Sequence, residues 1–134
     1  MLMPADFTTE LNTAVADKLD EGQKIRLANQ NTRFVLSSIL HSEQGARSLS
    51  ASLTQILRDP GAVEWAANQT REEARHVTGF SNYIGLRWGT PLQSGATLPG
   101  LLNEIVKSSA VYKKRVGMQM QIEGLAMGAR FRTS

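Results

Sequence analysis

The stretch NQTREEARHVTGF, residues 68–80, holds a carboxylate and an imidazole three positions apart, Glu73 and His76. In a helix, residues separated by three or four positions share one face, so both side chains would point the same way. Carboxylate oxygens and imidazole nitrogens are ligands of divalent transition metals. The pair therefore indicates either half of a metal site or a salt-bridge cluster on the surface, and other residues must distinguish the two.

Two further carboxylates, Glu43 and Glu123, stand where a helical apolar stripe requires an apolar residue. The stripes comprise Leu36, Ile39, Leu40, Ser50, Leu53 and Leu57 around Glu43; Ala66, Val77, Phe80 and Ile84 around Glu73; and Ile105, Tyr112, Val116, Gln119 and Ala126 around Glu123. Carboxylates are almost never fully buried unless they are paired or bind a metal. Three of them on three stripes therefore indicate a shared site.

An ionic core without metal is the alternative interpretation. Glu43 and Arg47 are four positions apart, and Glu73 could pair with Arg47 or Arg75. The only other histidine, His41, lies two positions from Glu43 and so belongs to another face of its helix.

The elements that must position these residues are all predicted to be helices. Long runs are rich in good helix formers, and clear breaks occur only at RDPG, residues 58–61, and at WGTPLQSGATLPG, residues 88–100. The predicted helices cover residues 7–27, 29–58 and 61–88, with a fourth within residues 101–132. Nothing between the first two is a strong helix breaker, so they could form one helix with a bend.

The turn between the second and third helices places the candidate ligands at one level. Glu43 lies 16 residues before Asp59, whereas Glu73 and His76 lie 12 and 15 residues after Gly61. With a rise of about 1.5 Å per residue, an antiparallel hairpin makes these groups nearly level. We therefore expect the three side chains to converge on the buried face within about 8 Å, where one metal with bonds of about 2 Å could join them.

Composition excludes several classes of function. The 134 residues correspond to one domain, and the absence of cysteine excludes disulfide frameworks and thiolate chemistry. The N-terminus does not resemble a signal peptide and no run is apolar enough to span a membrane, so we expect a soluble cytoplasmic protein.

The net charge is −2 over residues 1–70 and +5 over residues 71–134. Nucleic-acid surfaces usually have a stronger basic stripe interleaved with aromatic residues, so we expect a solvated helix face instead.

Glu43, then EEARH about thirty residues later, then QIEGLAMGARF with Glu123, together resemble the ferritin-like di-iron carboxylate superfamily. EEARH resembles a ligand helix of bacterial multicomponent monooxygenases, and IEG followed by Phe131 resembles one of the ribonucleotide reductase small subunit. Aldehyde-deformylating oxygenases have similar ligand spacing. The resemblance covers roughly residues 30–132 and implies a single ferritin-like helical domain over residues 1–134.

In that superfamily two helices each supply a Glu, and two others each supply Glu-x-x-His. The resemblance implies Glu43 as terminal ligand of a first metal, Glu73 as bridging ligand, His76 as the ligand that completes the first metal, and Glu123 as terminal ligand of a second. The implied cofactor is iron, with manganese as the alternative. The second Glu-x-x-His is absent from the sequence. We therefore expect an incomplete ferritin-like bundle of three long helices plus an N-terminal helix. Three explanations are open: the domain is truncated at its C-terminus, another chain completes the bundle, or the protein has lost the metal site.

The resemblance also implies that the helix with EEARH and the helix with Glu123 run parallel. The connection is too short unless LPGLLNEIVKSS, residues 98–109, forms a separate short helix and the ligand helix begins near Ser109.

The implied function is an oxidoreductase of the oxygenase or oxidase type that activates dioxygen at a di-iron site, incomplete in this chain. The alternative is a non-catalytic iron-binding or storage module, or a helical interaction protein with a degenerate site. We expect no robust oxygenase turnover from an isolated chain. We also expect a homodimer, or a higher even oligomer, through the ligand-bearing helices. Three helices leave an apolar side uncovered, and a two-fold axis could bring together two sets of Glu43, Glu73 and His76.

Overall fold

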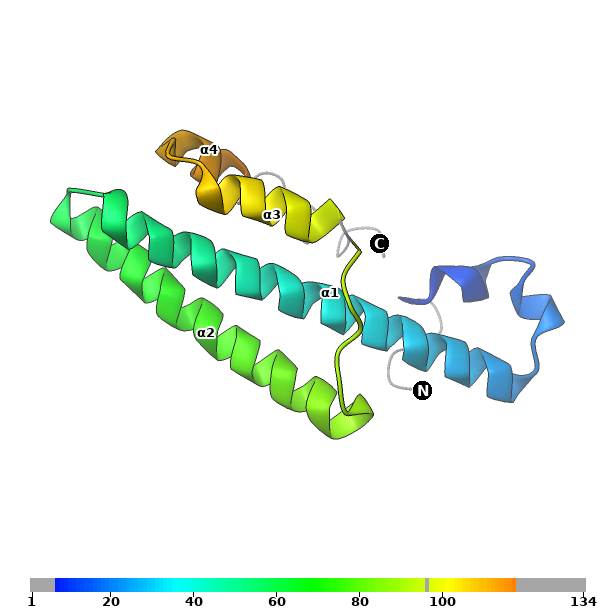
Figure 1. Ribbon diagram of the computed structural model, residues 1–134. Helices are drawn as coiled ribbons and strands as arrows, with labels where there is room; N and C mark the ends of the chain where they lie inside the picture. The colour runs from blue at the N-terminus through cyan, green and yellow to red at the C-terminus, as the bar shows by residue number, and fades with distance from the viewer. Residues whose placement is uncertain (1–6, 96, 118–134) are drawn as a thin grey trace.

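The computed structural model describes residues 7–95 and 97–117, and within these residues it contains helices and irregular segments but no strand (Figure 1). The elements in chain order are the 3-10 helices η2 (Thr9–Asn12) and η3 (Ala16–Lys18), followed by the α-helices α1 (Glu21–Ile56), α2 (Pro60–Trp88), α3 (Thr97–Lys107) and α4 (Val111–Val116). The predicted all-α class is confirmed.

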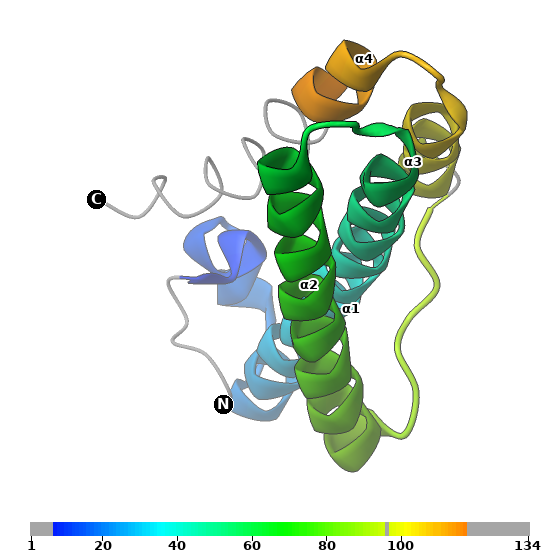
Figure 2. The same ribbon diagram turned by 90° about the vertical axis from the view of Figure 1, so that its left-hand side faces the viewer.

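Two long antiparallel helices, α1 and α2, form the frame of the molecule (Figure 1). Helix α3 packs on α1, which lies between α2 and α3 in both views (Figures 1 and 2). The described part of the chain therefore contains two of the three expected long helices, and most of the segment expected to form the third, residues 118–132, lies outside the described residues. No helix in residues 7–95 and 97–117 is long and apolar enough to cross a membrane.

The predicted helix over residues 7–27 is wrong for residues 7–20 and confirmed for residues 21–27. This segment forms two short 3-10 helices, and α1 then runs from Glu21 without a break through residues 27–29. Local hydrogen bonds explain the difference. The Thr13 hydroxyl donates to the carbonyl oxygen of Glu10, 2.7 Å away, and such bonds favour turns over helix. Asp20 then begins α1, because its carboxylate accepts from the backbone N–H of Gln23 while the Gln23 side chain accepts from the backbone N–H of Asp20.

The limits of α2 agree with the predicted helix over residues 61–88. The Asp59 carboxylate accepts a hydrogen bond of 2.8 Å from the backbone N–H of Ala62, and Pro60 occupies the first turn, where its missing N–H costs nothing. The helix ends at Gly89, whose φ of 81° lies in the region that glycine tolerates best.

The expected break before the last helix is confirmed. Helix α3 ends at Lys107, and α4 begins at Val111. The chain reverses between them, since the Lys114 ammonium group donates to the carbonyl oxygen of Val106 and to the Ser52 hydroxyl. Close packing holds α3 on α1, because a Cβ on Gly45 would lie only 2.5 Å from a methyl carbon of Leu102.

The connection from α2 to α3 is tied to α1 by three side chains spaced four residues apart. Arg33 donates to the carbonyl oxygen of Thr90 at 2.8 Å, and the Ser37 hydroxyl accepts from the backbone N–H of Leu92 at 3.0 Å. His41 Nε2 donates to the carbonyl oxygen of Leu92 at 2.9 Å. His41 thus has a structural role on the face of α1 that turns away from Glu43.

Candidate metal centre

The structure brings together three of the four predicted site residues. Glu43 lies near the middle of α1, and Glu73 and His76 lie on the facing part of α2. One potential ligand atom from each residue lies within 4.8 Å of those of the other two. His76 Nδ1 is 3.3 Å from Oε2 of Glu43 and 3.3 Å from Oε2 of Glu73. The predicted convergence is confirmed, whereas Glu123 lies outside the described residues.

The three side chains differ in burial. The exposed fraction is 7% for Glu73, 22% for Glu43 and 54% for His76. The expectation that all three lie on the buried face is therefore wrong for His76. The described helices explain this exposure, since α1 is the only described helix packed extensively against α2, whereas α3 packs on α1.

Gln69 supports the buried carboxylate and was not identified from the sequence. Its side-chain amide donates to Oε1 of Glu73, one helical turn away. This bond fixes one oxygen of Glu73 and leaves Oε2 facing His76 and Glu43. The sequence signal was the i, i+4 spacing of Gln69 and Glu73, which occurs often on helices without any site.

The proximity of the two carboxyl groups changes how the site binds protons. The pKa of Glu43 is raised from 4.5 to about 7, first by burial and then by the hydrogen bond and negative charge of Glu73. His76 acts in the opposite direction and lowers this pKa. Burial disfavours the charged form of His76, but hydrogen bonds and charges from Glu43 and Glu73 outweigh it and raise the pKa of His76. The cluster therefore holds protons at a pH where isolated carboxyl groups would have lost them.

No arginine or lysine compensates these carboxylates within the part of the chain that the structure describes. Arg75 forms its ion pair with Glu72 at 3.0 Å, and Arg47 forms no ion pair with Glu43 or Glu73. The ionic-core interpretation has no cationic partner here except His76.

The donor set fits a divalent metal. Two ligands on one metal lie roughly 3–4 Å apart when each bond is about 2 Å, so the 3.3 Å separations already match. The widest separation, 4.8 Å, needs a side-chain movement of about 1 Å. A cation bound here would offset the repulsion that otherwise keeps a proton on the carboxyl pair.

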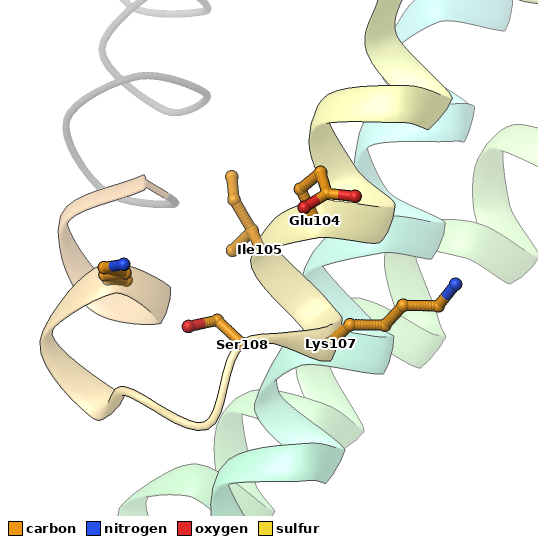
Figure 3. Close-up of a pocket in the computed structure, with 5 residues that line it drawn as sticks. Glu104, Ile105, Lys107 and Ser108 are labelled. Atoms are coloured by element: carbon orange, nitrogen blue, oxygen red, sulfur yellow. The ribbon is translucent and has the colours of Figure 1, made fainter.

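A hollow of about 350 Å³ lies between α3 and α4, apart from the Glu43–Glu73–His76 cluster. Glu104, Ile105, Lys107, Ser108 and Lys113 line it. The Lys107 side chain extends away from Ser108 and Ile105, so these polar groups do not converge on one point (Figure 3). This hollow shows no arrangement of charges suited to a ligand.

Comparison of the chain with family models, with curated proteins and with solved structures finds no match. The geometry of the Glu43–Glu73–His76 cluster is therefore the basis for a functional proposal.

Proposed function

We propose that this protein binds iron through Glu43, Glu73 and His76 as part of a ferritin-like di-metal carboxylate centre of the oxygenase or oxidase type. The observation that supports the proposal is the convergence of two carboxylates and one imidazole from two antiparallel helices within 4.8 Å. Carboxylate and imidazole ligands suit Fe(II) and, as an alternative, Mn(II). When bound, such a metal supplies the electrons that reduce dioxygen.

Each residue has a distinct role in the proposal. Glu73 would be the bridging carboxylate; its Oε2 faces His76, while its Oε1 accepts a hydrogen bond from Gln69. Glu43 is the terminal carboxylate of the first metal, and His76 binds through Nδ1, the nitrogen that faces both carboxylates. Glu123 is the proposed carboxylate of a second metal.

A non-catalytic iron-binding protein is the second candidate. The observation that favours it is the 54% exposure of His76, which would leave a metal open to bulk water in the single chain. Enzymes that activate oxygen usually exclude water from the reacting centre. The two candidates differ in turnover and not in metal binding.

Metal analysis after addition of Fe(II) to the purified chain tests the common part of the proposal. We expect iron to remain bound after gel filtration in the native chain and in Glu72→Gln, and to be lost in Glu73→Gln. Glu72 is a matched control, because it adjoins Glu73 but pairs with Arg71 and Arg75. A native chain without bound iron, or Glu73→Gln with undiminished iron, would contradict metal binding at this cluster.

Oxygen consumption by the iron-loaded chain then separates the two candidates. Stoichiometric consumption that stops after oxidation of the bound iron supports the non-catalytic candidate. Continued consumption with an added electron donor, lost in Glu73→Gln, supports the oxidoreductase.

A further inference from the structure

The two carboxylate oxygens of Glu73 have different surroundings. Oε2 lies 3.3 Å from Nδ1 of His76 and so faces the cluster. Oε1 accepts a hydrogen bond from the side-chain amide of Gln69, one helical turn earlier in α2. The Glu73 side chain is buried, so little water is available to replace this bond. Hydrogen bonds to charged acceptors are among the stronger ones in proteins, and Gln69 therefore holds Oε1 firmly.

This hydrogen bond restricts what Glu73 can offer to metal ions. A bridging carboxylate gives one oxygen to each of two ions, so a second ion at this centre needs Oε1. The amide N–H of Gln69 occupies that oxygen. As long as the bond persists, Glu73 can bind an ion through Oε2 but cannot bridge two.

The charges of the described residues also favour a single ion. The two carboxylates of the cluster, Glu43 and Glu73, balance the charge of one divalent cation when both are ionised. Gln69 is neutral, and the adjacent acid on α2, Glu72, forms ion pairs with two arginines. In the part of the chain that the structure describes, one group of acidic and histidine side chains is arranged to hold a metal. A second cation would be repelled by the first without a described carboxylate to offset that repulsion.

We propose that Gln69 limits this centre to one tightly bound ion per chain, and that a second ion binds only when the Gln69 amide releases Oε1 of Glu73. The inference rests on the proposed function, because it concerns the same metal centre. Gln69 is a positioning residue here, since it acts on the metal through Glu73. Its amide directs Oε2 toward the first ion and withholds Oε1 from the second.

These two effects predict opposite changes when the amide is removed. In Gln69→Ala, Oε2 loses its support, so the affinity for a first Mn(II) should fall by about tenfold. Oε1 becomes free, so the affinity for a second Mn(II) should rise by about tenfold, which corresponds to the loss of one hydrogen bond to a charged group. A merely structural role of Gln69 would weaken both. Alanine favours helix, so α2 should persist in this variant.

Gln69→Glu tests the contribution of charge. Glutamate has nearly the shape of glutamine, but its ionised side chain has no N–H to donate and adds a carboxylate beside Oε1. The affinity for the second ion should therefore rise further than in Gln69→Ala.

Thr70→Ala is the matched control. Thr70 adjoins Gln69, but its hydroxyl donates to the carbonyl oxygen of Ala66 at 2.8 Å and not to Glu73. This variant should keep both affinities of the native chain.

Titration calorimetry with Mn(II) at pH 8 measures the number of bound ions and the affinity of each. For the native chain we expect one ion in a first phase, with any second ion bound roughly tenfold or more weakly. Circular dichroism of each variant reports whether the helices are retained.

Two ions bound with equal affinity by the native chain would overturn the inference. So would a second-ion affinity that does not rise in Gln69→Ala. In both results the native chain still binds metal, so the proposed function stands. A native chain that binds no Mn(II) would contradict the proposed function and the role of Gln69 together.

Discussion

His76 Nδ1 lies 3.3 Å from Oε2 of Glu43, although the two residues are 33 positions apart and belong to antiparallel helices. The same nitrogen lies 3.3 Å from Oε2 of Glu73. Two carboxyl groups and a ring thus face one point without an arginine or lysine among the described residues to compensate them. Such an arrangement is unfavourable for a metal-free fold and suits a bound cation.

The stability of the metal-free chain should fall as the pH rises from about 5 to 8. The folded state raises the pKa of Glu43 from 4.5 to about 7 and also raises the pKa of His76, so between these values it binds more protons than the unfolded state. The stabilisation is complete below the unfolded pKa and is lost as the pH passes the folded pKa. After allowance for solvent screening, we expect a loss of about 1–2 kcal/mol for Glu43.

Glu43→Gln should remove much of this pH dependence, because glutamine is neutral at every pH. At pH 8 its free energy of unfolding should exceed that of the native chain by up to about 1 kcal/mol, as often occurs when a functional residue is replaced. Urea denaturation at several pH values measures the effect, with Glu72→Gln as the control that keeps the native slope. A Glu43→Gln chain that is less stable than native at pH 8 would show that the carboxylate stabilises the metal-free fold.

Metal affinity should rise with pH, whereas the stability of the metal-free chain should fall. A metal must displace the protons that Glu43 and His76 hold, and the pKa of Glu43 is about 7. Affinity for Mn(II) should therefore rise by roughly tenfold per pH unit between pH 6 and 7 and level off above pH 8. Titration calorimetry at pH 6, 7 and 8 measures this dependence. Equal affinities at the three values would mean that the metal binds elsewhere.

The sequence was sufficient to predict α2 and the level of Glu73 and His76 along it, because Asp59, Pro60 and Gly89 are strong local signals and the rise of a helix is fixed. It was insufficient for residues 7–20, where the spacing of Leu11, Val15 and Leu19 suits a helix. Hydrogen bonds of Thr13 and the cap formed by Asp20 prevail there.

The exposure of His76 illustrates a second limit. The apolar pattern of α2 shows which residues share a face, but burial depends on whether another helix covers that face. Helix α3 packs beside Gly45 on a different side of α1, a contact that no local pattern predicts.

Gly45 should be required for the packing of α3. A Cβ there would lie 2.5 Å from a methyl carbon of Leu102, so Gly45→Ala should lower the free energy of unfolding by about 1 kcal/mol even though alanine favours helix. Gly85→Ala is the matched control, because nothing lies within 4 Å of its Cβ and the change should stabilise by up to about 1 kcal/mol.

A double-mutant cycle identifies the cause. In a Leu102→Ala background, Gly45→Ala should no longer destabilise, since the clashing side chain is absent. A cost that persists in this background would place the strain within α1 itself.

The most direct test of the central claim is a titration of the metal-free chain with Co(II) at pH 8, followed by its visible absorption. The native chain and Glu72→Gln should show saturable cobalt absorption with the same affinity. Glu73→Gln should bind at least 100-fold more weakly, because it loses the buried carboxylate that faces both other ligands. Equal affinity in Glu73→Gln and Glu72→Gln would contradict a metal centre at Glu43, Glu73 and His76.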